Sequence, residues 1–310
     1  MNVQQLLNKL TPQDRNLVRP GARLSELTTL RVGGPASLLC PIHNPDQAQR
    51  FHAIARQNDI PLFILGGGSN VLAADRGFDG MVLKVATDHL ARQGEVITAG
   101  AGLDFDQLIA RTLALGLTGL EFASGIPGTL GGAVVGNAGC YGHEIGEFLV
   151  DAKILQPDGR VETVGPETFG FRYRETDLRE SGRIVLEVRL RLHQGDVHAA
   201  AATRAEKIAD RRRKHPVDLP SAGSWFRNLP APAVGQRRQA AGLLLEQAGA
   251  KNLSEGDAHV FVHHANMIVN MGKATSEDVL KLAAGMKSAV KNKFGLTLIE
   301  EVRYLSNETC

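Results

Sequence analysis

The sequence predicts an α+β protein built from two domains. Helical and strand-like segments are interleaved along the chain, but they form no regular strand–helix–strand repeat. The chain has 310 residues, which is enough for two domains at about 150 residues each. Its composition changes near residues 194–198, just before a long helical segment, and we place the domain boundary there. An apolar fraction of 43% and a charged fraction of 22% are ordinary for a globular protein and exclude a disordered chain.

The first half of the chain is expected to alternate helices with short strands. Residues 3–10 have helical spacing and stop at Thr11-Pro12, because proline is disfavoured inside a helix. Residues 24–32 are typical of a strand that enters the tight turn Gly33-Gly34-Pro35. The later elements are a helix over 46–58, strands over 61–65, 80–85 and 95–99, and a helix over 104–115 that Gly116 ends.

The second half begins with a hairpin, since residues 152–156 and 160–164 flank the turn sequence Pro157-Asp158-Gly159. A strand follows over 184–192, where charged and aliphatic residues alternate as in a half-buried strand. The remaining elements are a helix over 197–214, a loop over 221–230, a helix over 241–248, a strand over 258–270, a helix over 276–294 and a last strand over 296–305.

Charge and cysteine usage narrow the class of protein. Lys and Arg number 35 and Asp and Glu 33, so the net charge of 35 − 33 = +2 predicts no general attraction to nucleic acid or anionic lipid. The cysteines, Cys40, Cys140 and Cys310, are too few for a disulfide framework or a Cys-rich zinc site. No secretory signal pattern and no apolar run of about 20 residues is visible. We therefore expect a cytoplasmic protein that binds neither nucleic acid nor membrane.

Several common motifs are incomplete. Gly272-Lys273 is followed by Ala, so a phosphate-binding P-loop is excluded, and the run that begins at Gly66 lacks the last glycine of a dinucleotide fingerprint. His259 and His263 would lie about 13 Å apart on one strand, so we expect no metal site there. The basic run over 211–214 is interpreted as a solvated helix end, because no aromatic platform accompanies it.

Glycine is the abnormal component of this sequence. It accounts for 34 of 310 residues, about 11% against a usual share of roughly 7%. One cluster, 66–68 before Ser69-Asn70, follows a buried strand, and a larger one covers 125–142. Consecutive glycines let the main chain approach an anion closely. The clusters therefore favour a large, flat ligand that carries a diphosphate.

Eight short motifs follow one another along nearly the whole chain. They are Thr29–Gly34, Leu65–Asn70, Gly125–Thr129, Asn137–Gly139, Phe171–Arg174, Pro220–Ser224, His264–Asn270 and Glu300–Arg303. In this order the sequence resembles the UDP-N-acetylenolpyruvoylglucosamine reductases of bacterial peptidoglycan synthesis. The resemblance implies a two-subdomain FAD-binding unit of the vanillyl-alcohol-oxidase (PCMH) type, followed by an α/β substrate-binding domain. We expect an N-terminal segment over 1–27, the FAD-binding domain over 28–195 and the C-terminal domain over 196–310.

The segment between Leu192 and Pro220 holds only one helix, so the chain resembles the shorter family type that lacks an extra substrate-capping insertion. The reaction that the resemblance implies is the NADPH-dependent reduction of UDP-N-acetylglucosamine enolpyruvate to UDP-N-acetylmuramate. Hydride would pass from flavin N5 to the vinyl carbon, and a proton would be added to the adjacent carbon. FAD would be bound non-covalently, since the first glycine cluster contains no histidine, and a monomer is expected.

The resemblance also assigns site residues. Ser224 matches the proton donor, and Arg174 and Glu301 match the residues that polarise the substrate carboxylate. The positions implied for substrate binding are Lys214, Asn228 and His264. The positions implied for FAD are Gly66, Gly67, Gly68, Ser69, Asn70, Ile126, Pro127, Gly128, Thr129, Gly132, Asn137 and Ala138.

Three positions depart from the family pattern. Leu229-Pro230 follows Asn228 where the family usually has Asn-Pro, so the exit of the Ser224 loop is expected to differ in shape. Arg227 replaces a common Lys, and Cys140 replaces a small residue and is interpreted as a compact apolar residue near the cofactor.

Two alternatives remain open at this point. A sugar or hydroxy-acid oxidase of the same fold would consume oxygen without NADPH, and it would leave the contexts of Ser224 and Glu301 unexplained. A UDP-sugar-binding regulator without catalytic activity would bind flavin weakly or not at all.

Overall fold

The computed structural model describes residues 3–233 and 235–308 and divides into two compact units. The first unit comprises Met1–Gly21, Ser37–Gly67 and Gly80–Asp210, and the second comprises Ala22–Ala36, Gly68–Asp79 and Arg211–Cys310. The sequence-based domains, 28–195 and 196–310, are each one continuous range. The second unit of the structure instead combines the C-terminal part of the chain with two segments from the N-terminal part, Ala22–Ala36 and Gly68–Asp79. The mixed helix and strand content confirms the α+β class.

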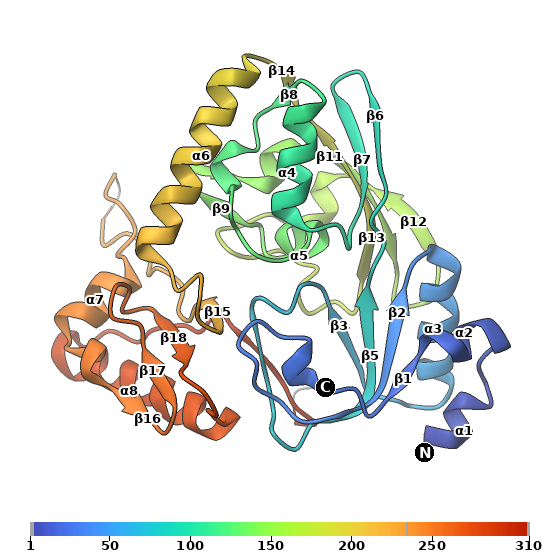
Figure 1. Cartoon of the computed structure of the whole chain (residues 1–310), viewed down its shortest axis with the longest axis horizontal. Coiled ribbons are helices and arrows are strands. Elements are labelled where there is room, and N and C mark those ends of the chain that lie inside the picture. The colour runs from blue at the N-terminus through green and yellow to red at the C-terminus, as the bar shows by residue number, and fades with distance from the viewer. Residues whose placement is uncertain (1–2, 234, 309–310) are drawn as a thin grey trace. The chain divides into compact units, whose positions relative to one another are not determined.

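The first sheet of the first unit has the strand order β1-β2-β5-β3. Its strands are β1 (Arg19–Pro20), β2 (Ala36–Ile42), β3 (Leu62–Leu65) and β5 (Phe78–Val85). β3 and β5 run parallel, with Leu65 opposite Lys84. Helix α3 (Pro45–Gln57) lies along one face of this sheet (Figure 1), where Phe51 is buried in the same core as Leu38 and Leu83. Because β3 ends at Leu65, this sheet sets the position at which the first glycine cluster begins.

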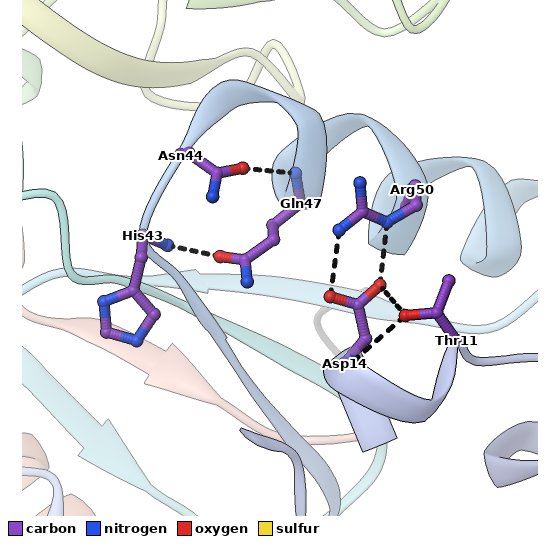
Figure 2. A network of polar contacts seen from close by, with 6 residues as sticks. All are labelled: Thr11, Asp14, His43, Asn44, Gln47 and Arg50. Carbon is purple, nitrogen blue, oxygen red and sulfur yellow. Dashed lines mark hydrogen bonds and ion pairs between the residues drawn. The ribbon is translucent and has the colours of Figure 1, made fainter. Parts of the chain in front are cut away.

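The chain begins with the short helices α1 (Val3–Leu7) and α2 (Pro12–Leu17), and an ion pair between Asp14 and Arg50 joins α2 to α3 (Figure 2). Asp14 is 1% exposed and accepts hydrogen bonds from Arg50 Nε at 2.7 Å and Nη2 at 2.9 Å. The Thr11 hydroxyl donates to the same carboxylate and accepts from the Asp14 N–H, which begins α2. The Arg50 hydrogen bond lowers the pKa of Asp14, so this carboxylate stays ionised in the folded protein.

The second sheet of this unit has the order β12-β11-β13-β7-β6. Its strands are β6 (Leu90–Gln93), β7 (Val96–Gly100), β11 (Leu149–Leu155), β12 (Val161–Val164) and β13 (Ile184–Arg191). β11 and β12 form the expected antiparallel hairpin. β13 alternates buried and more exposed residues from Leu186 onward, whereas Ile184, Val185 and Leu186 are all buried. Helices α4 (Phe105–Ala114) and α5 (Leu130–Val135) contribute to the same core. Helix α6 covers Val197–Lys214, the range that the sequence predicts.

Short elements complete the first unit. They are β8 (Leu117–Thr118), β9 (Gly139–Cys140), β10 (His143–Glu144), β14 (His193–Gln194) and the 3-10 turns η2 (Glu121–Ala123), η3 (Ile145–Phe148) and η4 (Pro166–Phe169). Cys40 is buried in the core, and this burial raises the pKa of its thiol to about 12. Cys310 lies outside the described residues.

The second unit is built on the sheet β15-β18-β17-β16. Its elements are η1 (Leu24–Glu26), β4 (Val71–Ala73), β15 (Ser221–Ser224), α7 (Ala241–Gln247), η5 (Ala250–Asn252), β16 (Ser254–Glu255), β17 (Ala258–Val260), β18 (Met267–Asn270), α8 (Ser276–Phe294) and β19 (Arg303–Leu305). β4 and β19 pair in parallel. Trp225, Phe226 and Met286 are buried in one apolar core.

Four sequence-based expectations are wrong. The loop expected over 221–230 begins with strand β15, which pairs with β18. Residues 24–32 are not a strand, because η1 and a turn at Arg31, whose φ is +57°, break the extended run. Residues 258–270 form two strands, and the turn between them lacks the Gly or Pro that would have revealed it. Of residues 296–305 only Arg303–Leu305 is a strand. In the described part of the chain, every helix is too short or too polar to cross a bilayer.

Candidate active site

Two loops of the first unit meet where the sequence predicts cofactor binding. A Cβ on Gly66 would lie 2.7 Å from Thr129 Oγ1, and one on Gly67 would lie 2.6 Å from Gly128 Cα. Both glycines are therefore required first of all for the close packing of these two loops, whereas the sequence argument assigned that closeness to a ligand. Gly132 also lies here, 4.0 Å from the position of a Gly66 Cβ.

This loop junction offers hydrogen-bond donors. Among the described residues, the N–H groups of Gly67 and Gly128 have no backbone acceptor. Lys84 lies at the start of the first loop, where its ammonium group donates to the Gly66 carbonyl oxygen. Donors and a cation at closely packed loops fit the diphosphate of a dinucleotide. The residues of this junction therefore fit the FAD that the resemblance implies, and Lys84 is a residue that sequence reasoning missed.

Asp106 of α4 holds the second loop. Its carboxylate accepts from the Gly125 N–H at 2.8 Å and from Arg204 Nη2 of α6 at 2.5 Å. Ile126 then donates its N–H to the Ala123 carbonyl, so Ile126 and Pro127 follow a fixed turn. The two helices thus position the segment that contains Gly128 and Thr129.

Asn137 has a structural task that the resemblance did not reveal. It is 1% exposed with φ at +44°, and its side chain donates to Glu144 Oε2 and to the Arg172 carbonyl. Its Oδ1 accepts from the Gly146 N–H. The amide is thus fully used by protein, and only the main chain around Asn137-Ala138 remains for a cofactor.

The end of the first glycine cluster belongs to the second unit. A Cβ on Gly68 would lie 2.1 Å from the Leu27 carbonyl oxygen. Asn70 donates from Nδ2 to the Glu301 carbonyl, and its own carbonyl accepts from the Arg303 N–H. The run that includes Ser69 and Asn70 is thereby joined to the segment that carries Glu301.

Ser224 is the last residue of β15 and lies opposite Met267 of β18. The next residue, Trp225, is 1% exposed, and its carbonyl accepts from the Glu301 N–H at 2.8 Å. The structure therefore brings Ser224 and Glu301 onto neighbouring segments of the second unit. Arg174, the third residue assigned to catalysis, lies in the first unit.

Asn266 fixes the Ser224 segment from the other side. Its Oδ1 accepts from the Phe226 N–H at 2.9 Å and its Nδ2 donates to the Phe226 carbonyl at 2.8 Å. Its backbone carbonyl accepts from the Trp225 N–H. Sequence reasoning assigned no role to Asn266 beyond its motif, although a polar residue inside an apolar strand run was a signal for such a buried contact.

Arg174 has an unusual backbone conformation. Its φ is +59°, in the left-handed region that side chains other than glycine rarely adopt. Its guanidinium carbon lies 5.4 Å from the centre of the Tyr173 ring. Strain of this kind persists only where the surroundings impose it, and it is common at functional sites.

Two of the three residues assigned to substrate binding, Asn228 and His264, lie at the start of α7, and Lys214 is the last residue of α6. Asn228 Oδ1 accepts from the Ala241 N–H at 3.0 Å. The His264 ring lies next to Gly242, where a Cβ would be 3.2 Å from Cε1. Lys214 is near enough to contribute to the lowered pKa of His264. Leu229, the departure after Asn228, pairs with Gln239 in an isolated bridge, so this loop exit is ordered.

The state of His264 follows from its surroundings. Burial is the largest cause that lowers the pKa of His264, so the ring is mainly neutral at pH 7. Its Nδ1 accepts from the Asn266 N–H at 3.3 Å, which places the ring proton on Nε2. His264 thus presents an N–H donor rather than a full positive charge.

The remaining expectations concern Cys140 and metals. The Cys140 sulfur donates to the Phe122 carbonyl, so this residue does more than pack as a small apolar group. Within residues 3–233 and 235–308 there is no group of three or more His, Cys, Asp and Glu side chains that could hold a metal ion.

The fold and the loop junction define a flavin-binding oxidoreductase of the PCMH type. Residues 36–165 match the FAD binding domain, and residues 215–305 match the C-terminal domain of UDP-N-acetylenolpyruvoylglucosamine reductase. The chain belongs to the UDP-N-acetylenolpyruvoylglucosamine reductase family, as its relatives show.

A reductase of this name from Symbiobacterium thermophilum is 36% identical over 94% of this chain and 93% of its own length. Its counterpart from Bacillus velezensis is 35% identical over 98% and 99%. The solved structure of UDP-N-acetylenolpyruvylglucosamine reductase from Thermus caldophilus superposes with a TM-score of 0.77 at 32% identity, covering 92% of this chain and 97% of that chain. Phl p 4.0202, a glucose dehydrogenase, shares the fold alone, with a TM-score of 0.51 at 12% identity, over 96% of this chain and 64% of that chain.

Proposed function

We propose that this protein reduces UDP-N-acetylglucosamine enolpyruvate to UDP-N-acetylmuramate with NADPH, in the synthesis of peptidoglycan precursors. The observation that supports this best is the pairing of Ser224 and Glu301 on segments joined through Trp225, in a chain of this family. An oxidase of the same fold has no need of such a pair.

The cofactor is FAD, held by the two loops of the first unit. Bound FAD supplies the two-electron chemistry that links NADPH to the enolpyruvyl double bond. The main chain of Gly66, Gly67 and Gly128 provides close approach, and Thr129, the residue after Gly128, provides a short polar side chain.

Ser224 delivers the proton. Its Oγ donates to the substrate carbon beside the carboxylate, and the hydroxyl afterwards recovers a proton from solvent. A serine hydroxyl is a weak acid, so it acts only on a strongly basic carbon held within hydrogen-bond distance. The two hydrogen bonds from the Asn266 side chain to the Phe226 backbone hold the segment that contains Ser224 in place, which supports the role of Ser224 as proton donor.

Arg174 and Glu301 act on the substrate carboxylate, where negative charge develops during the reaction. The planar guanidinium of Arg174 suits a carboxylate with two parallel hydrogen bonds. Glu301 requires a shared proton next to that carboxylate, since two bare carboxylates repel each other. Lys214, Asn228 and His264 bind the UDP moiety, with Lys214 as the cation and His264 as a neutral donor.

The cytoplasmic location, the monomeric state and the absence of nucleic-acid or membrane partners remain predictions from composition and charge. The preference for NADPH over NADH is implied by the family alone.

The test is an anaerobic absorption spectrum of the purified protein, taken before and after NADPH and again after the UDP-enolpyruvyl sugar. We expect the flavin bands to bleach with NADPH and to return with that sugar. Recovery with oxygen and a carbohydrate, but not with the UDP-sugar, would identify the oxidase. A protein that takes up no FAD, or that binds the sugar without turnover, would support the regulator.

A further inference from the structure

Lys84 is a cation without a counterion. It lies on β5 opposite Leu65, the last residue of β3, and its ammonium group donates to the carbonyl oxygen of Gly66. In the described part of the chain no carboxylate forms an ion pair with it, and burial alone lowers the pKa of Lys84. Such a group is costly to bury unless an anion compensates its charge.

The direction of Lys84 follows from the alternation along β5. Met81, Leu83 and Val85 are buried in the core that contains α3. Lys84 lies between Leu83 and Val85, so its side chain leaves the sheet on the opposite face. That face is the one from which it reaches Gly66, where the predicted cofactor loop begins.

The surroundings of Gly66 are rich in donors. Its neighbours across the junction are Thr129 and Gly132, and the N–H groups of Gly67 and Gly128 have no backbone acceptor within the described chain. The Gly66 carbonyl uses one of the three ammonium protons of Lys84. The other two protons remain for an anion with several acceptor oxygens on the carbonyl side of the Gly66–Gly67 peptide, whereas the Gly67 N–H of the same trans peptide points to the opposite side.

We propose that Lys84 binds the diphosphate of FAD. The inference rests on the FAD-binding function of the first domain and adds to it the residue that neutralises the cofactor. The alternative is that Lys84 only supports the Gly66 carbonyl, and the two roles differ in what the charge does.

The experiment measures FAD affinity in apoprotein prepared by removal of the flavin. Lys84→Met removes both the charge and the hydrogen bond, whereas Lys84→Gln keeps an N–H donor for Gly66 and removes only the charge. We expect both variants to raise the Kd for FAD by about 10- to 100-fold, the loss of one charge-assisted bond. Lys84→Gln should leave the thermal midpoint of the apoprotein within about 2 °C of wild type.

The matched control is Lys153→Met. Lys153 lies on β11 and pairs with Glu187, so this variant removes an equal charge from the same unit without touching the loop junction. It should bind FAD as the wild type does. If wild-type apoprotein itself fails to take up FAD, the proposed function is wrong rather than the role of Lys84.

ADP shows whether the charge of Lys84 acts on the diphosphate or on the flavin ring, because ADP carries a diphosphate but no flavin ring. We expect Lys84→Gln to weaken ADP by a factor similar to that for FAD, and the midpoint potential of the bound flavin to stay unchanged. A shifted potential with unchanged ADP affinity would overturn the proposal, since the lysine would then face the ring. Unchanged FAD affinity in Lys84→Gln, or a fall in apoprotein stability without a change in affinity, would show a purely structural role.

Discussion

Asn228 is expected to act both in folding and in substrate binding, and substitutions at this position can separate the two roles. The family pattern makes it a substrate residue, whereas its Oδ1 accepts from the Ala241 N–H at 3.0 Å, at the first residue of α7. Loss of such a bond costs about 1 kcal/mol, as for other side chains that cap helices. In the second unit this corresponds to about 3–5 °C in the unfolding midpoint. Asn228→Ala should show this loss and also a KM for the UDP-sugar raised about fivefold or more.

Asn228→Asp distinguishes the two roles, because aspartate caps helices about as well as asparagine. Its stability should match the wild type, while its negative charge next to a diphosphate should raise KM by about tenfold or more. Asn252, exposed in the same unit, supplies the controls Asn252→Ala and Asn252→Asp, which should change neither quantity. Calorimetry and steady-state kinetics provide the two readouts. Wild-type stability in Asn228→Ala would refute the capping role, and a wild-type KM in Asn228→Asp would refute the substrate contact.

Three further predictions follow from the same structure. Ser224→Ala should leave flavin reduction by NADPH intact and slow reoxidation by the UDP-sugar by about 10²–10⁴-fold in stopped-flow traces; normal reoxidation would remove Ser224 as the donor. Arg174→Gly should be about 1 kcal/mol more stable than Arg174→Ala, because only glycine adopts φ +59° without strain, while both lose turnover; equal stabilities would contradict the strain. Asp14→Asn should lower stability by about 2 kcal/mol at pH 7, a low figure because Arg50 is 42% exposed. Folding lowers the pKa of Asp14, so its contribution to the free energy of unfolding is present above its ordinary pKa and is lost as pH falls through the folded value. The stabilities of Asp14→Asn and the wild type should therefore converge in acid. A stability difference that persists in acid would contradict the ion pair.

Periodicity and composition were sufficient for many elements. The helix over 197–214 and the helix over 276–294 have the predicted bounds. The first is rich in Ala, Arg and Lys, which favour helix, and the second is amphipathic and ends at Gly295. The run over 258–270 was misread as one strand, since its turn is made by hydrogen bonds of His264 and Asn266 rather than by glycine or proline. Patterns of neighbouring residues in the sequence do not reveal such hydrogen bonds.

The candidate site shows the same division. The order of the motifs was sufficient to identify the family and to nominate Ser224, Arg174 and Glu301. It could not show that Asn266 clamps the Ser224 segment, or that Lys84 reaches Gly66 from a neighbouring strand, because both contacts join residues far apart in the chain. Nor could it show that Asn137, nominated for the cofactor, uses its whole side chain on protein.

The sequence by itself determined the α+β class, the main helices, the glycine-rich loops and the family. These depend on local spacing and on which residues follow one another. Only the tertiary structure decided that residues 22–36 and 68–79 belong with the C-terminal unit, that Gly66 and Gly67 are needed for loop-to-loop packing, and which side chains support the site. The physical reason is that packing, burial and hydrogen bonding are set by neighbours in space, and these can lie more than 200 positions apart in the chain, as Asn70 and Glu301 do.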